Sequence, residues 1–231
     1  MNTDEITWVS GWASDFSVWE DRIYEQFPSY SHRFIDYFDL LPEPDAFWDK
    51  NPRVADSGTV VGWSMGTLAL LRNLHKKNSE QKWILLCPIA NFCVKGCWQI
   101  AVVRATRQGI LENTEKTLMS FSALMGDTQD MEKWVENALR YSPNQLAAGL
   151  DYLQKTSAKP CEAQNVELVF GEKDKVVPIA QKELFSELFP KFSVRVVENT
   201  GHWVFNIMSK CMAGATHTEW RHITPPARTS Q

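Results

Sequence analysis

Short apolar runs alternate along the chain with longer stretches in which apolar residues recur at helical spacing. Six runs have the length and the content of aliphatic and aromatic residues that buried strands show: residues 6–9, 33–38, 59–62, 83–87, 166–170 and 193–197. Strands that alternate with helices are typical of a parallel sheet with crossover helices on both faces. The pattern therefore predicts an α/β fold with a mostly parallel sheet of about six strands.

Two segments between the early strands have the pattern of helices. Asp15 can cap the first helix. Apolar residues of that helix fall four positions apart, at Trp19, Ile23 and Phe27. Residues 65–74 repeat apolar positions at 3.6-residue spacing and predict the second helix. Both helices are expected to pack on the sheet.

The strand pattern disappears between Ala90 and Lys159, where helical periodicity is broken near Gly109, near Gly126 and at Ser142-Pro143. This predicts an all-helical insertion within the α/β frame.

Three kinds of segment follow from this division. Residues 1–90 and 160–212 are expected to form the α/β core, and residues 91–159 a helical lid over it. From Ala213 the chain turns polar, so residues 213–231 are predicted to be a loose tail.

Composition and charge narrow the class of protein. The 231 residues are 44% hydrophobic and 23% charged, and 24 Lys plus Arg stand against 28 Asp plus Glu, a net charge of -4. These proportions are typical of a globular domain, and no apolar run approaches the roughly 18 residues that cross a bilayer. A nucleic-acid binder needs a concentrated basic surface, which this chain lacks. We expect no membrane and no nucleic acid among its partners, and a monomer.

The cysteines and the N-terminal residues bear on metal binding and location. The five cysteines are odd in number and lack the paired spacing of zinc ligands, so we interpret them as reduced thiols. The N-terminus has neither a basic start nor an apolar stretch of signal-peptide length. The sequence therefore predicts a cytoplasmic protein.

A Gly-x-Ser-x-Gly motif, Gly62-Trp-Ser-Met-Gly66, stands where a predicted strand gives way to a predicted helix. The turn is too tight for a Cβ at either glycine, and it lifts the Ser64 hydroxyl clear of the sheet edge. A serine hydroxyl is a weak nucleophile at neutral pH, so Ser64 needs a histidine as base and an acid to orient that histidine.

Both partners can be found downstream, each after a predicted strand. Asp174 follows the strand at 166–170, and His202 follows the strand at 193–197. Because parallel strands end at one edge of the sheet, Ser64, Asp174 and His202 are expected to meet there. Glu172 is an alternative acid on the same loop.

Four segments resemble the α/β-hydrolases, and specifically the pimeloyl-acyl-carrier-protein methyl ester esterases of biotin synthesis. Val9-Ser-Gly-Trp12 resembles their oxyanion loop, and Gly62-Trp-Ser-Met-Gly66 matches their nucleophile turn. Residues 170–178 resemble the acid loop, and Gly201-His202 the histidine turn. Residues 121–124 and 149–153 look like lid segments, so the likeness covers roughly residues 6–205.

This resemblance implies roles for residues around the motif. The backbone N–H groups of Met65 and Trp12 would form the oxyanion hole, and Trp12, Trp63 and Phe121 would line an acyl channel. It also implies a carboxylesterase that acts on a short or medium acyl ester without metal or organic cofactor, with an acyl carrier protein as partner.

Among the departures of the chain from the family, two lie beside the expected site. Ser10 stands where the oxyanion loop usually has a histidine, and Trp203-Val-Phe205 replaces the usual Pro-Phe after the histidine. Basic residues that could contact an acidic carrier protein are few in the predicted lid; they are Arg104, Arg107, Lys116, Lys133 and Arg140.

Two other hypotheses remain open at this point. The same triad could cleave a thioester, a lactone or a carbon–carbon bond. A non-catalytic protein with a hydrolase fold could instead bind a ligand or a partner. Labelling of Ser64 by a fluorophosphonate separates this last hypothesis from the enzymatic ones.

Overall fold

The computed structural model describes residues 2–126 and 130–203, and its centre is one parallel sheet. Six strands lie in the order β2-β1-β3-β4-β5-β6, and each neighbouring pair is parallel. Their bounds are β1 Asn2–Val9, β2 Ser31–Ile35, β3 Ser57–Trp63, β4 Lys82–Leu86, β5 Val166–Gly171 and β6 Ser193–Val197. The predicted α/β architecture with a parallel sheet of about six strands is confirmed.

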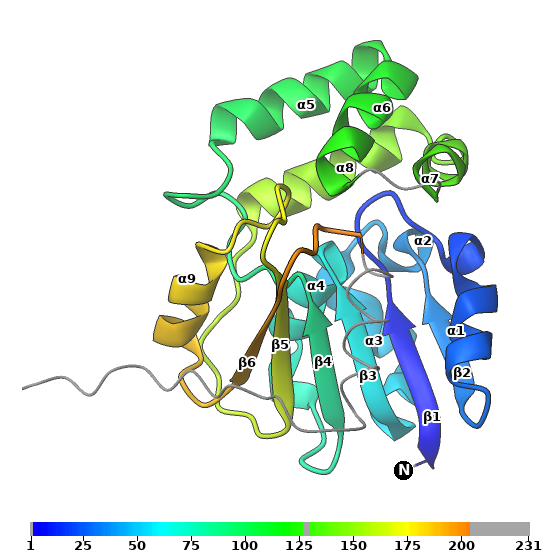
Figure 1. Ribbon diagram of the computed structural model, residues 1–231, viewed down its shortest axis with the longest axis vertical. Coiled ribbons are helices and arrows are strands. Elements are labelled where there is room, and N and C mark those ends of the chain that lie inside the picture. The colour runs from blue at the N-terminus through cyan, green and yellow to red at the C-terminus, as the bar shows by residue number, and fades with distance from the viewer. Residues whose placement is uncertain (1, 127–129, 204–231) are drawn as a thin grey trace, which may run out of the picture.

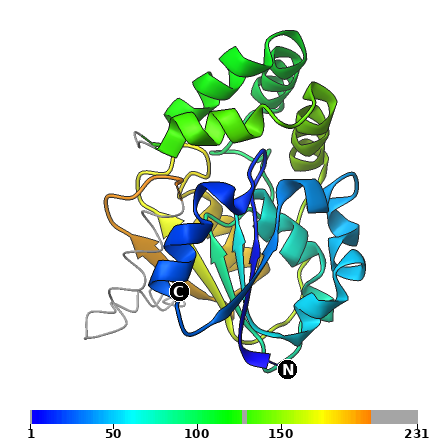
Figure 2. The same cartoon turned by 90° about the vertical axis from the view of Figure 1, so that its right-hand side faces the viewer.

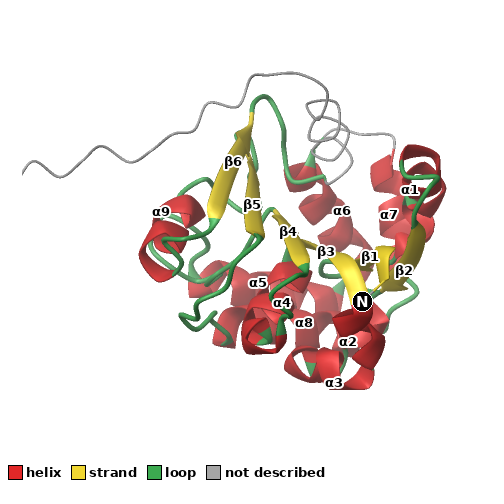
Figure 3. Ribbon diagram, turned by 90° about the horizontal axis from the view of Figure 1, so that it is seen from below, coloured by secondary structure: helices red, strands yellow, loops and turns green. Residues whose placement is uncertain are grey.

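Helices cover both faces of this sheet, as Figure 3 shows. In that view α1 lies on one face, whereas α2, α3, α4 and α9 lie on the other. These helices are α1 Glu20–Gln26, α2 Tyr37–Leu40, α3 Phe47–Lys50, α4 Met65–Arg72 and α9 Gln181–Leu188. Apolar side chains of strands and helices, such as Trp83, Ile23 and Leu68, are fully buried between the layers. Their burial supplies the main force that holds the layers together.

Four helices between β4 and β5 lie beyond the carboxyl ends of the strands (Figures 1 and 2). They are α5 Ile100–Glu112, α6 Thr114–Met125, α7 Asp130–Ala138 and α8 Pro143–Lys155. The helical character of this stretch matches the periodicity of the sequence. Whether this stretch behaves as a lid separate from a core stays a prediction, and the predicted tail at 213–231 lies outside the described residues.

Two of the predicted boundaries that differ from the structure have a clear local reason. The strand predicted at 33–38 ends at Ile35, because Tyr37 and Leu40 face the core from one turn of α2 while Phe38 is 64% exposed. The break predicted near Gly109 lies at Asn113, between α5 and α6, and α5 continues through Gly109. A Cβ at Gly109 would lie 2.8 Å from the hydroxyl of Thr117, so this glycine allows α6 to approach closely.

Asp15 caps a short 3₁₀ turn, Phe16–Val18, and not the predicted helix itself, because α1 begins only at Glu20 with Trp19 as its N-cap. The other helix signals have their expected local basis. Gly126, with a φ of 138°, follows the last residue of α6. Ser142 and Gln145 form a capping box at the start of α8, with Pro143 in its first turn.

The register of the sheet sets its carboxyl edge. Trp63, the last residue of β3, pairs with Leu86 of β4, and Gly171 of β5 pairs with Val197 of β6. The loops that follow these strands therefore begin side by side at the same edge, beneath α5–α8 (Figure 1).

Candidate active site

Ser64 lies in the sharp turn between β3 and α4. Its φ of 52° and ψ of -122° are unusual for a residue with a side chain. A Cβ on Gly62 would lie 2.5 Å from the side chain of Leu70, and one on Gly66 would lie 2.7 Å from the carbonyl oxygen of Val9. Backbone atoms exclude any Cβ at Gly66, whereas glycine at 62 avoids a clash with the Leu70 side chain. Together the two glycines allow the turn that presents the Ser64 hydroxyl above the sheet.

His202 and Asp174 form a chain of hydrogen bonds with this hydroxyl. The Oγ of Ser64 lies 3.0 Å from Nε2 of His202, and Nδ1 of His202 lies 2.8 Å from Oδ2 of Asp174. All three residues are at most 7% exposed. The side chains that the sequence placed at one sheet edge therefore meet in space, in the order acid, histidine, serine.

The loop after β5 fixes which carboxylate faces His202. Oδ1 of Asp174 accepts hydrogen bonds from the backbone N–H groups of Val176 and Val177, both at 2.8 Å. Glu172 instead accepts from the backbone N–H of Asn199 at the surface. Asp174 is the residue that reaches the imidazole, and Glu172 does not replace it.

The loops that carry Asp174 and His202 approach closely because Gly171 has no side chain. A Cβ there would lie 2.6 Å from the carbonyl oxygens of Thr200 and Gly201. The backbone N–H of Lys173 donates to the carbonyl of Thr200 at 2.9 Å. This contact sets the distance between acid and base.

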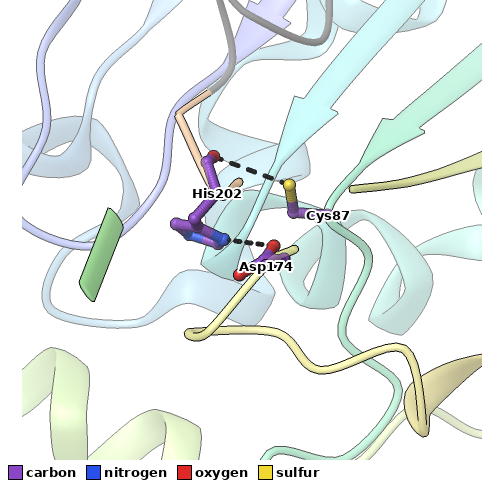
Figure 4. A group of neighbouring side chains, drawn as sticks. All are labelled: Cys87, Asp174 and His202. Atoms are coloured by element: carbon purple, nitrogen blue, oxygen red, sulfur yellow. Dashed lines mark hydrogen bonds and ion pairs between the residues drawn. The ribbon is translucent and has the colours of Figure 1, made fainter. Parts of the chain in front are cut away.

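Cys87 is a neighbour of the pair that sequence reasoning did not single out (Figure 4). Cys87 was predicted as the last residue of a strand, but it lies just after the end of β4 at Leu86 and has a φ of 49°. Its Sγ lies 3.6 Å from the carbonyl oxygen of His202. The signal for it was its place at the carboxyl end of a strand, next to the strands that lead to Ser64 and Asp174.

The surroundings of Cys87 favour the neutral thiol over the charged thiolate. Complete burial and the adjacent carboxylate of Asp174 raise the pKa of this thiol well above its ordinary value. Ligand atoms of Cys87, Asp174 and His202 lie within 4.8 Å of one another. A cation bound there would have to displace both the thiol proton and the proton between Asp174 and His202, so we assign these groups to hydrogen bonding.

Trp12, Trp63 and Phe121 all line a small pocket at Ser64 and His202. The cavity is about 10 Å³, close to the room that a single water needs. Apart from these residues its walls are apolar, and they comprise Phe92, Met125, Leu150, Leu153 and Val176. Such a lining favours an uncharged, apolar group next to the serine.

Trp63 has a second contact that the sequence did not reveal. Its indole N–H donates to the carbonyl oxygen of His202 at 3.0 Å, and its ring lies 5.3 Å from the imidazole. Trp63 therefore borders the pocket and also holds the backbone of His202.

The two backbone N–H groups expected to form an oxyanion hole stand near Ser64. Met65 is the first residue of α4, so its N–H has no acceptor within the helix. Trp12 follows Gly11, where a Cβ would lie 3.1 Å from Cβ of Ser64, and this close approach places the loop beside the serine. Within residues 2–126 and 130–203, neither N–H donates a hydrogen bond.

Residues of α7 and α8 hold the loop after β1, and sequence reasoning missed them because they lie more than a hundred positions away. The indole N–H of Trp12 donates to the carbonyl of Leu146 at 2.8 Å. The indole N–H of Trp134 donates to the hydroxyl of Ser14 at 2.8 Å. Ser10 is buried, and its hydroxyl donates to the carbonyl of Ser14 at 2.8 Å.

The basic residues noted in α5–α8 differ in their surroundings. Arg107 forms an ion pair with Asp151 at 3.0 Å, and Arg140 forms one with Asp15 at 3.4 Å. The remaining three are exposed; they are Arg104, Lys116 and Lys133.

Comparison with known proteins identifies the family. The α/β-hydrolase family matches residues 12–206, so the chain belongs to it. None of the curated proteins compared with the chain matches it. None of the helices in residues 2–126 and 130–203 combines the length and hydrophobicity that a bilayer crossing needs.

Solved structures share the fold at low sequence identity. An esterase from Exiguobacterium antarcticum is similar with a TM-score of 0.76 and 16% identity, over 91% of this chain and 89% of that chain. An esterase from Rhodococcus sp. ECU1013 has a TM-score of 0.70 and 16% identity, over 92% and 89%. MenH from S. aureus has a TM-score of 0.62 and 20% identity, over 91% of each chain. The chain is thus a hydrolase of the α/β fold with esterases among its structural neighbours.

Proposed function

We propose that this protein is a serine carboxylesterase that hydrolyses an ester with an apolar acyl group through an acyl-enzyme. The observation that carries the proposal is the continuous hydrogen-bonded chain from Asp174 through His202 to Ser64, at the floor of an apolar pocket. The esterases among the structural neighbours support the same class of reaction.

The geometry defines a role for each group in the acylation step. Ser64 Oγ attacks the ester carbonyl carbon while its proton passes to Nε2 of His202. Asp174 accepts the hydrogen bond from Nδ1 of His202, which fixes the ring and stabilises the imidazolium. The N–H groups of Met65 and Trp12 stabilise the negative oxygen of the tetrahedral intermediate, a contribution of roughly 3 to 4 kcal/mol for each such donor.

Collapse of this intermediate completes the turnover. His202 returns the proton to the leaving oxygen, and the alcohol departs. A water molecule then attacks the acyl-enzyme as His202 takes its proton, and the free acid leaves as Ser64 regains its hydrogen. No other residue needs to change its protonation state.

The test is hydrolysis of p-nitrophenyl esters with acyl chains of increasing length. Ser64→Ala should lower kcat at least about 10³-fold because the nucleophile is lost. Ser186→Ala, which removes an exposed hydroxyl on α9, is the matched control and should keep wild-type activity. Retention of more than a few per cent of activity in Ser64→Ala would reject the mechanism.

Fluorophosphonate labelling distinguishes an enzyme from a binding protein. A functional serine should be labelled in the wild type and in Ser186→Ala, but not in Ser64→Ala. An unlabelled wild-type protein would favour the non-catalytic binding function. Parallel assays with thioester and lactone substrates separate the other triad hydrolases from an ester hydrolase.

The specific substrate that we propose is the methyl ester of pimeloyl-acyl-carrier protein. The methyl ester removes the charge of the terminal carboxylate, so that end of the chain is compatible with the apolar pocket. Arg104, Lys116 and Lys133 are the exposed bases available to an acidic carrier protein. Hydrolysis of the carrier-bound ester well above that of a free methyl ester supports this substrate, and equal rates reject use of the carrier. The cytoplasmic location and the monomeric state stay predictions from the sequence.

A further inference from the structure

The turn that carries His202 is bonded to two helices that lie over the sheet. The backbone N–H of His202 donates to the carbonyl of Met125, the last residue of α6, at 3.2 Å. The indole N–H of Trp203 donates to Oδ2 of Asp130, the first residue of α7, at 3.0 Å. The ends of α6 and α7 thus hold the turn that supplies the base.

Asp130 is itself held from a third direction. Both of its carboxylate oxygens accept hydrogen bonds from the guanidinium of Arg22 in α1, at 2.7 and 2.8 Å. The side chain of Asp130 is only 14% exposed, so water screens this paired contact less than it screens an open surface ion pair. One carboxylate therefore connects α1, α7 and the histidine turn.

Packed aromatic rings connect Trp203 to His202. Trp203 is 1% exposed, and its ring stacks on Trp19 with centroids 5.6 Å apart. Its ring also contacts the edge of Trp63 at 5.7 Å, and Trp63 donates to the carbonyl of His202. Because this cluster is closely packed, a shift of Trp203 displaces the turn that keeps His202 within 3.0 Å of the serine.

We propose that Asp130 is a positioning residue, which through Trp203 keeps His202 in reach of Ser64. The inference rests on the proposed function. Asp130 contacts neither Ser64 nor the pocket, so its effect is expected on the rate of the chemical step and not on substrate affinity. The helices over the sheet then help to assemble the base as well as to cover the pocket.

The experiment compares kcat and KM for Asp130→Ala, Asp130→Asn and Arg140→Gln with the wild type. Asp130→Ala should lower kcat about 10- to 100-fold with KM changed less than about twofold, because a misplaced base slows the chemical step. Asp130→Asn keeps an oxygen that can accept from the indole and should recover part of the loss. Arg140→Gln removes another ion pair of the same region, with Asp15, and should leave kcat unchanged for a p-nitrophenyl ester, a substrate without a carrier protein.

Two further measurements test the positioning role of Asp130. Fluorophosphonate labelling of Ser64 should slow in the same ratio as kcat in Asp130→Ala. The imidazole NMR signals of His202 report its position without any substrate and should move in Asp130→Ala but not in Arg140→Gln. If Asp130→Ala does not fold, the same measurements are made on Asp130→Asn and Arg22→Gln.

The outcomes separate this inference from the proposed function. A folded Asp130→Ala variant with wild-type kcat, or with unchanged His202 signals, overturns the positioning role alone. An equal loss of kcat in Arg140→Gln also overturns it, because the effect would then be general to ion pairs of this region. A wild-type protein without Ser64-dependent hydrolysis overturns the proposed function, and the His202 signals still decide the positioning role.

Discussion

At the residue scale, the backbone near Ser64 leaves no room for a side chain at Gly66. Gly66 lies where the first turn of α4 passes the end of β1. A Cβ there would lie 2.7 Å from the carbonyl oxygen of Val9 and closer still to that of Ser10. Backbone atoms cannot rotate away as a side chain can, so the turn or the strand must move.

Gly66→Ala is therefore predicted to impair both stability and activity. Overpacking of this kind lowers the free energy of unfolding by about 1 to 3 kcal/mol. Displacement of Ser64 should lower ester hydrolysis at least about tenfold. Urea unfolding and p-nitrophenyl ester kinetics measure the two effects.

Gly109→Ala is the comparison for this change. Its new Cβ would meet the hydroxyl of Thr117, a side-chain atom that can rotate, and alanine favours a helix over glycine by about 1 kcal/mol. Gly109→Ala should lower the free energy of unfolding less than Gly66→Ala does, and it should leave kcat unchanged. Equal effects at the two positions would show that local crowding at Gly66 is unimportant.

At the scale of elements, α6 closes the pocket with Phe121. The ring lies 5.0 Å from Trp12 in an edge-to-face contact and 6.1 Å from Trp134. Since the cavity has room for little more than one water, an acyl chain can enter only if such side chains move. Phe121 is the wall residue whose removal enlarges the pocket from the side of the helices.

Phe121→Ala is predicted to change the preference for acyl length. The ratio of kcat/KM for ten-carbon to four-carbon p-nitrophenyl esters should rise several-fold, since a longer chain fills the space left by the ring. Met119→Ala, on the same helix with its side chain 59% exposed, should leave the ratio unchanged. A ratio that stays constant in Phe121→Ala would place the acyl chain elsewhere.

At the scale of the whole molecule, one carboxyl couples stability to pH. Burial, with the nearby charges of Asp15 and Asp39, raises the pKa of Asp36 from an ordinary 3.8 to about 6, although its contact with the N–H of Phe16 opposes the rise. The folded state therefore holds this proton more tightly than the unfolded state. The resulting stability is present at low pH and is lost as pH rises through about 6.

Asp36→Asn should remove this dependence. The amide keeps an oxygen that can accept from Phe16 but has no charge to bury. The free energy of unfolding of the variant, relative to that of the wild type, should increase by about 2 kcal/mol between pH 4 and pH 7. Urea unfolding at both pH values, at constant ionic strength, measures the change; parallel curves for the two proteins would contradict it.

The sequence by itself was sufficient for the fold class and for the residues that meet at the sheet edge. Ser64, Asp174 and His202 each follow a strand, and parallel strands bring their carboxyl ends to one edge whatever the details of packing. Glycines at 62 and 66 gave the sharp turn for a local steric reason. These signals depend only on residues within a few positions of each site, so they can be recognised in the sequence.

Only the tertiary structure decided which distant groups support these three. Trp12 bonds to the carbonyl of Leu146, Asp130 bonds to Arg22 and Trp203, and Cys87 lies against His202. These partners are separated by 73 to 134 positions along the chain. Their meeting depends on how α1, α6, α7 and α8 pack, and packing follows from the summed burial of many side chains and not from any short motif.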